Sequence, residues 1–108
     1  MSIQATERRE QAFEEFAKAV HDALGERVHE IILYGSVARG DATERSDVDV
    51  LVVLDSKDET DELFQLSFDI GVKHGVAIIP HLQTKDHFES RQDWPFLKNV
   101  LSEGRSYG

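Results

Sequence analysis

Residues 33–54 read LYGSVARGDATERSDVDVLVVL. Residues 46–54 within this stretch form a β-branched and aliphatic run that contains Asp47 and Asp49, which predicts a buried strand. Because strand side chains alternate between two faces, Asp47 and Asp49 are expected to project from the same side. Successive side chains on one face lie roughly 7 Å apart, so both carboxylates can reach one divalent cation or two adjacent ones. The spacing therefore predicts a metal site.

A second predicted strand, residues 28–34, comes before this one and ends at Gly35 and Ser36. Glycine lets the backbone come close to a ligand, and serine supplies a hydroxyl and an amide group. If residues 37–39 begin a short helical turn, their amide groups form the start of an anion site. A turn that holds phosphate and faces a carboxylate pair is what metal-assisted attack on a nucleotide phosphate requires.

The combination of Gly35-Ser36, Arg39-Gly40 and Ser46-Asp47-x-Asp49 resembles the signature of the polymerase-β-type nucleotidyltransferases, in the small stand-alone form called minimal nucleotidyltransferases. The resemblance covers most of the chain, since the helix before the motif and the helix and strand after it also follow in family order. It implies an α/β (α+β) fold, in which helices flank a short mixed sheet. The site residues that it implies are the catalytic metal ligands Asp47 and Asp49 and the nucleotide contacts Gly35, Ser36, Arg39 and Ser46.

The resemblance also implies an activity, the transfer of AMP from ATP to a hydroxyl acceptor with Mg²⁺ as cofactor. Gly35 and Ser36 would hold the β- and γ-phosphates, and pyrophosphate would leave. Arg39 could bind a triphosphate through two hydrogen bonds, although an arginine on a solvated loop is the commoner case. Family members of this size are often antitoxins, and a tyrosine of a small helical HEPN ribonuclease toxin is then the acceptor. The implied partners are ATP or another nucleoside triphosphate and a HEPN-type toxin.

A third strand is predicted over residues 76–84, and it departs from the family pattern. Catalytically active relatives carry a third acidic residue on this strand, whereas residues 76–84 contain none. His81 could in principle serve as a ligand, but a lone histidine on a strand is more often solvated or satisfied by neighbours. Asp86 lies just past the strand and is expected to cap the next helical turn.

The missing carboxylate leaves three hypotheses open. The first is an active nucleotidyltransferase. The second is a binding module with the nucleotidyltransferase fold, which neutralises a partner or binds nucleotide without transfer. The third is a subunit whose active site is completed by another chain.

Other motif families fit these residues less well. A phosphate-binding P-loop needs a lysine where this chain has Asp41, and a calcium-binding EF-hand loop needs polar residues where it has residues 50–54. Glycosyltransferases also use Asp-x-Asp with a metal, but their domains are usually larger, and Gly35-Ser36 would have no role.

Length and composition limit the remaining possibilities. A chain of 108 residues is expected to form one domain with a single core. Its net charge of −9 argues against strong binding to nucleic acid or to an anionic membrane surface. With only five lysines, the acidic surface could reflect a salt-rich host or an ordinary acidic protein. The chain has no cysteine and no apolar run long enough to span a bilayer, so we expect a cytoplasmic protein.

The remaining elements follow from periodicity and helix-stop residues. Apolar side chains at helical spacing predict a first helix over residues 6–24 with Thr6 as N-cap, and a second helix that ends at about His74. Short helices are expected over residues 85–91 and 95–104.

Proline and the hydrophobic pattern also predict which strand lies at the edge of the sheet and which lies inside it. Pro80 cannot donate a ladder hydrogen bond, which predicts that residues 76–84 form an edge or bulged strand. Both faces of residues 48–54 are apolar enough to be covered, which predicts a central strand.

Overall fold

The computed structural model describes residues 3–58 and 60–107. In chain order its helices and strands are α1 (Ile3–Leu24), the 3-10 helix η1 (Gly25–Arg27), β1 (Val28–Tyr34), α2 (Ser36–Arg39), β2 (Val48–Leu54), α3 (Asp61–His74), β3 (Ile78–Thr84), α4 (Lys85–Ser90), α5 (Pro95–Glu103) and β4 (Arg105–Ser106).

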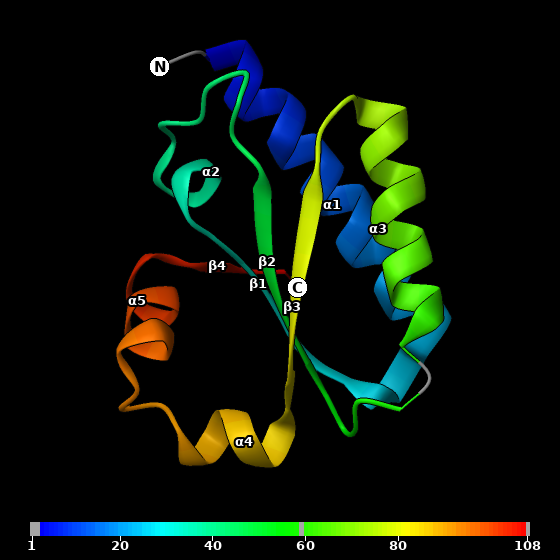
Figure 1. Ribbon diagram of the computed structural model, residues 1–108, viewed down its shortest axis with the longest axis vertical. Helices are drawn as coiled ribbons and strands as arrows, with labels where there is room; N and C mark the ends of the chain where they lie inside the picture. The colour runs from blue at the N-terminus through cyan, green and yellow to red at the C-terminus, as the bar shows by residue number, and fades with distance from the viewer. Residues whose placement is uncertain (1–2, 59, 108) are drawn as a thin grey trace.

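The four strands form one mixed sheet in the order β3-β2-β1-β4 (Figure 1). β2 pairs antiparallel with β1 and parallel with β3, while β4 pairs antiparallel with the far side of β1. Two predictions are therefore confirmed: β2 is a central strand, and β3, which contains Pro80, is an edge strand. The predicted α/β fold with a short mixed sheet flanked by helices is confirmed as well.

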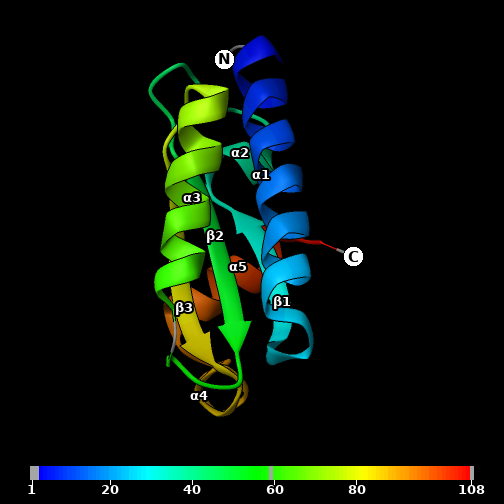
Figure 2. The same ribbon diagram turned by 90° about the vertical axis from the view of Figure 1, so that its right-hand side faces the viewer.

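The alternation of β2 side chains divides the core into two parts. Val48 and Val50 pack into a core shared with α1 and α3, which lie side by side over one face of the sheet (Figure 2). Leu51 and Val53 pack with residues of α4 and α5 on the opposite face. Asp49 has the parity of Leu51 and therefore belongs to the face that α4 and α5 cover only in part.

Two predicted helix caps are wrong. α1 already begins at Ile3, so Thr6 lies inside the helix, and its buried hydroxyl has no hydrogen-bond partner among the described residues. Asp86 lies in the first turn of α4, and it is Thr84 whose side chain accepts a hydrogen bond from the backbone N–H of His87 at 3.2 Å. Thr84 fits because it directly precedes the first helical residue and has the extended backbone that an N-cap requires.

The ends of the other elements differ little from the predictions. β3 begins at Ile78, two residues later than predicted, and α5 ends at Glu103. α3 ends at His74 as predicted, because Gly75 has the left-handed conformation (φ 69°) that terminates a helix. The two-residue strand β4 was not predicted. Within the described residues, no helix has the length and apolar character needed to cross a membrane.

Candidate active site

Asp47 and Asp49 lie where β2 begins. Asp49 is half-buried on the strand and is paired across the ladder with Tyr34, the last residue of β1, whereas Asp47 is exposed just before the strand. Burial, and next the neighbouring Asp47 carboxylate, raise the pKa of Asp49. Both effects disfavour an unpaired negative charge on Asp49, and a bound cation would relieve both. The structure thus brings the two predicted metal ligands together.

The turn that begins at Gly35 and continues into α2, which we call the Gly35 turn, lies directly against the Asp49 carboxylate. Gly35 has a φ of 79°, and a Cβ atom placed there would lie only 2.5 Å from Oδ2 of Asp49. Only glycine meets both requirements, a left-handed backbone and room for the aspartate. The two motifs that were separate in the sequence are therefore in direct contact.

The turn continues as the four-residue helix α2, as predicted. The backbone N–H of Arg39 donates to the carbonyl of Gly35 at 3.1 Å, and Gly40 ends the helix with a φ of 81°. The N–H groups of the first residues of such a helix have no acceptor within it. Among the described residues, the hydroxyl of Ser36 also has no hydrogen-bond partner. These groups are available to an anion.

Glu103, at the end of α5, is a residue of this site that the sequence did not reveal. Its Oε1 accepts a hydrogen bond from the backbone N–H of Gly35 at 3.2 Å, and Nη1 of Arg39 donates to Oε1 and Oε2 at 3.3 and 3.2 Å. These contacts place the predicted nucleotide contact Arg39 beside the turn. The bond to Glu103 raises the pKa of the Arg39 guanidinium, which keeps its positive charge.

The loop that leads to Asp47 is held by a buried arginine. Arg9 of α1 is only 3% exposed; its Nε donates to the carbonyl of Ser46 at 2.7 Å and its Nη2 to the carbonyl of Glu44 at 3.0 Å. The hydroxyl of Ser46 accepts from the backbone N–H of Thr43 at 2.9 Å, so it takes part in the loop itself. A nucleotide contact by Ser46 stays a prediction. No local pattern marks Arg9, because its partners lie 35 and 37 residues away.

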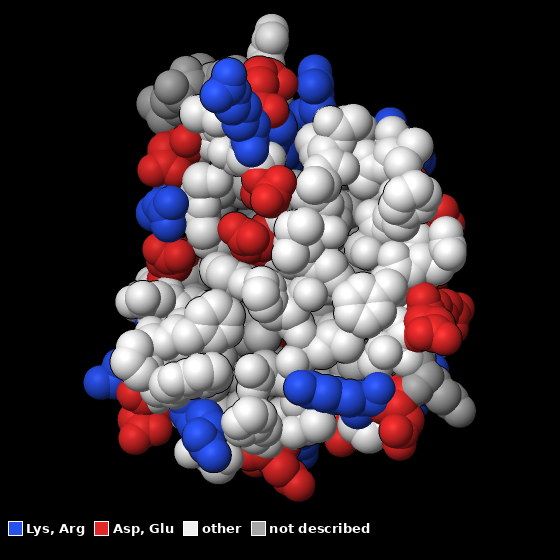
Figure 3. Space-filling model, viewed as in Figure 1, with Lys and Arg blue, Asp and Glu red and all other residues white. Residues whose placement is uncertain are grey.

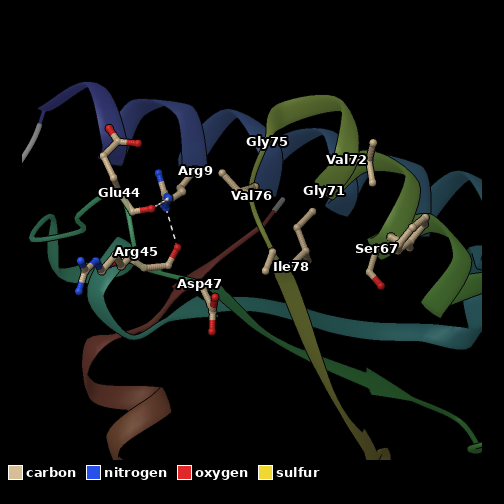
Figure 4. A pocket seen from close by; sticks show the side chains of 13 residues that line it. Arg9, Glu44, Arg45, Asp47, Ser67, Gly71, Val72, Gly75, Val76 and Ile78 are labelled. Carbon is tan, nitrogen blue, oxygen red and sulfur yellow. Dashed lines mark hydrogen bonds between the residues drawn. The ribbon is translucent and has the colours of Figure 1, made fainter.

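A cavity of about 550 Å³ opens beside this loop (Figure 4). Its polar side chains include Arg9, Asp47 and Ser67, and its apolar wall comes from α3 and from the segment leading into β3. In Figure 4 the Asp47 carboxylate extends away from the helices, so that it lies at the margin of the cavity. The cavity thus adjoins the carboxylate pair.

The strand that should carry the third carboxylate is β3. Its register places Ile79 beside Asp49 and His81 beside Leu51. His81 lies close enough to lower the pKa of Asp49 slightly, against the larger effect of burial. Within residues 3–58 and 60–107, however, no group of three or more His, Cys, Asp or Glu side chains is placed to hold a metal ion. The predicted ligand pair Asp47 and Asp49 is thus not joined by a third such side chain among the described residues.

Comparisons with known proteins identify the family. The model of the family described as nucleotidyltransferase domain matches residues 13–107. The chain is 40% identical over 96 residues, 89% of its length and 94% of the relative's, to a Methanocaldococcus jannaschii protein provisionally named a protein adenylyltransferase. A second protein of that organism with the same provisional name is 32% identical over 74 residues, which are 66% of this chain and 75% of the relative.

Two solved structures share the fold. A toxin-antitoxin crystal structure with AMP-PNP superposes with a TM-score of 0.58 at 16% identity, covering 88% of this chain and 73% of the other. A Sulfolobus solfataricus protein, provisionally named a nucleotidyltransferase, superposes with a TM-score of 0.54 at 20% identity, covering 97% and 84%. By the match over residues 13–107, the chain belongs to the nucleotidyltransferase domain family of the polymerase-β type.

Proposed function

We propose that this protein transfers AMP from ATP to a hydroxyl group of an acceptor protein, with Mg²⁺ bound by Asp47 and Asp49. The observation that carries the proposal is the direct packing of the Asp49 carboxylate on the Gly35 turn, 2.5 Å from the position that a Cβ would take. In this proposal, the contact sets the metal-binding carboxylates beside the turn that receives the phosphates. A family that is typically metal-dependent and relatives provisionally named protein adenylyltransferases support the choice of reaction.

This proposal gives each residue of the candidate site a role. Gly35, Ser36 and Arg39 bind and orient the β- and γ-phosphates, and Asp47 and Asp49 are the residues that would hold the metal. When bound, Mg²⁺ neutralises charge on the phosphate oxygens and lowers the pKa of the attacking hydroxyl. The acceptor hydroxyl gives up its proton to solvent as its oxygen bonds to the α-phosphorus, the bond from that phosphorus to the bridging oxygen breaks, and pyrophosphate leaves.

The acceptor is proposed to be a tyrosine of a HEPN-type toxin in the cytoplasm, which would make the protein an antitoxin. The toxin-antitoxin structure with AMP-PNP that shares this fold supports that context. A broad area without charged side chains occupies the middle of the face in Figure 3. Large apolar side chains are exposed on α3, at Phe64, Phe68 and Val72. Such surfaces suit a protein partner better than a nucleic acid.

One observation favours a second candidate function, a module that neutralises its partner by binding alone. The described residues offer two carboxylates to a metal, where active relatives are expected to have three. Capture of the toxin by a variant with both Asp47→Asn and Asp49→Asn would support this alternative, provided that the captured toxin is inhibited. Loss of inhibition in that variant would exclude it.

The direct test is label transfer from α-labelled ATP in lysate of the host, with purified protein and Mg²⁺. The wild type is expected to label one protein band, and Asp47→Asn is expected to abolish the label. Glu62→Gln, at an exposed position in the first turn of α3, is the matched control and should label normally. If Asp47→Asn labels as well as the control does, these aspartates have no part in the reaction.

A further inference from the structure

The segment of residues 103–105, which we call the C-terminal clamp, forms hydrogen bonds with two backbone groups of the Gly35 turn. Glu103 makes one of these bonds and Arg105 the other. Glu103 accepts the N–H of Gly35 at 3.2 Å, and Nη2 of Arg105 donates to the carbonyl of Val37 at 3.1 Å. The clamp is 64 or more residues away from the turn in the sequence. The last helix and strand therefore belong to the candidate active site.

Gly104 lets the clamp come this close to the sheet. A Cβ atom at Gly104 would lie 2.3 Å from the carbonyl oxygen of Val100 and 2.5 Å from Cγ2 of Ile32 on β1. The next residue, Arg105, pairs with Leu33 in the ladder between β4 and β1. The position of Glu103 is thus restricted by the two residues that follow it, through the close backbone packing of Gly104 and the strand pairing of Arg105.

The carboxylate of Glu103 leaves part of the Arg39 guanidinium free. It accepts hydrogen bonds from Nη1 of Arg39 at 3.2 and 3.3 Å. No described residue accepts a hydrogen bond from Nη2 of Arg39, and the side chain is 48% exposed. Nε of Arg39 donates to Oδ2 of Asp41 at 3.5 Å. A guanidinium that is held at two nitrogens and free at the third is restricted in its rotamers but can still bind an oxyanion.

We propose that Glu103 is a positioning residue for the nucleotide: through its contacts with Gly35 and Arg39 it holds both in the arrangement that receives the phosphates of ATP. The inference rests on the proposed function, because it takes Mg-ATP as the ligand. Without Glu103, the exposed Arg39 on its four-residue helix keeps only the 3.5 Å contact with Asp41. The ligand then has to order the arginine itself and binds more weakly. In this role Glu103 acts through Gly35 and Arg39 and not on the reacting atoms.

The test is a double-mutant cycle on the affinity for Mg-ATP, measured by calorimetry with the whole chain. Glu103→Ala is expected to weaken binding about tenfold, and Arg39→Gln by a similar factor. The double variant should be little worse than Arg39→Gln alone, because the two residues act together. Glu103→Gln, which keeps an oxygen for the Gly35 N–H, should recover part of the affinity.

Turnover separates positioning from a structural role. KM for ATP should rise about tenfold in Glu103→Ala, whereas kcat per folded molecule should change by less than about threefold. Additive effects in the cycle, or a lower melting temperature with unchanged affinity, would overturn the inference. Tighter binding by Glu103→Ala would also overturn it, because Glu103 would then be competing with phosphate.

The outcomes also distinguish this inference from the proposed function. A wild type that binds Mg-ATP but transfers no label contradicts the reaction, and the affinity cycle still decides the role of Glu103. A wild type that does not bind Mg-ATP contradicts both. Normal transfer with an additive cycle contradicts the role of Glu103 alone.

Discussion

Gly35 and Asp49 are in van der Waals contact without room for another atom: a Cβ at position 35 would lie 2.5 Å from Oδ2 of Asp49. Gly35 directly follows β1, and Asp49 lies on β2, where it pairs with Tyr34, the last residue of β1. The antiparallel register of two buried strands therefore sets the spacing between the phosphate turn and the metal ligands. This spacing does not depend on a flexible loop, which suits a site that must hold its groups in a fixed arrangement.

Gly35→Ala is expected to abolish label transfer, because the new methyl group displaces the Asp49 carboxylate. It should also lower the free energy of unfolding by about 3 kcal/mol, from the left-handed backbone and the clash together. Gly25→Ala is the matched control: Gly25 also has a positive φ, of 57°, but nothing lies within 4 Å of its Cβ position. It should lose only about 1–2 kcal/mol and remain active. Equal effects of both substitutions on activity would contradict the contact.

Asp49→Asn is expected to raise the melting temperature in EDTA at neutral pH. The folded protein holds the pKa of Asp49 above its ordinary value, so between the ordinary and the raised pKa the folded state binds more protons than the unfolded state. The wild type therefore loses stability as pH rises through this window, and the neutral asparagine does not. The difference should vanish in acid, below the ordinary pKa of an aspartate. Melting curves between pH 3 and 8 measure it, and an advantage for the wild type at pH 7 would contradict the account.

Arg9→Met is expected to destabilise the protein by about 3 kcal/mol, since it removes a buried cation that donates to three carbonyl groups, those of Ala5, Glu44 and Ser46. It should also weaken Mg²⁺ binding, because the loop it holds carries Asp47.

The neighbouring Arg8 supplies the control for this experiment. Its side chain is 49% exposed, with an ion pair to Glu44 at 3.5 Å. Arg8→Met should cost less than about 1 kcal/mol. Urea denaturation measures the free energy of unfolding of both variants. Similar losses of this free energy would mean that the burial of Arg9 is not what holds the loop.

Ile79→Asp is expected to supply the missing carboxylate. Ile79 pairs with Asp49 in the parallel ladder and is 37% exposed, whereas its neighbour Ile78 is buried in the opposite core. In EDTA the added charge beside Asp49 should lower the melting temperature, and Mg²⁺ should restore it by more than it stabilises the wild type.

Ile79→Asn, which is polar and of the same size as aspartate, is the control for that substitution. It should show no gain in the response to Mg²⁺. If Ile79→Asp responds to Mg²⁺ no more than Ile79→Asn does, position 79 does not face the metal site.

The sequence predicted best what depends on local patterns. The bounds of β1 and the end of β2 agree with the prediction, because two apolar runs end at residues with strong local preferences, at Gly35 and at Asp55. The start of β2 differs: the strand begins at Val48, so Asp47 lies just before it and not on it. The carboxylate pair and the turn could be predicted for the same reason, since their residues lie within 15 positions of one another.

What could not be predicted depends on contacts between distant residues. Glu103 contacts residues 64 and 68 positions away, and Arg9 contacts a loop more than 30 positions away. In the sequence, both look like ordinary charged residues of a solvated helix. β4, only two residues long, exists because β1 offers an edge, which no short pattern in residues 105–106 indicates.

The central claim is that the protein transfers AMP, which contains the α-phosphate of ATP, to the acceptor. The most direct measurement compares ATP labelled at the α-phosphate with ATP labelled at the γ-phosphate, using wild-type protein and Mg²⁺ in host lysate. The account predicts a labelled protein band with the α-label, none with the γ-label, and release of the γ-label in pyrophosphate. A band that carries the γ-label would show phosphoryl transfer instead and would contradict the account.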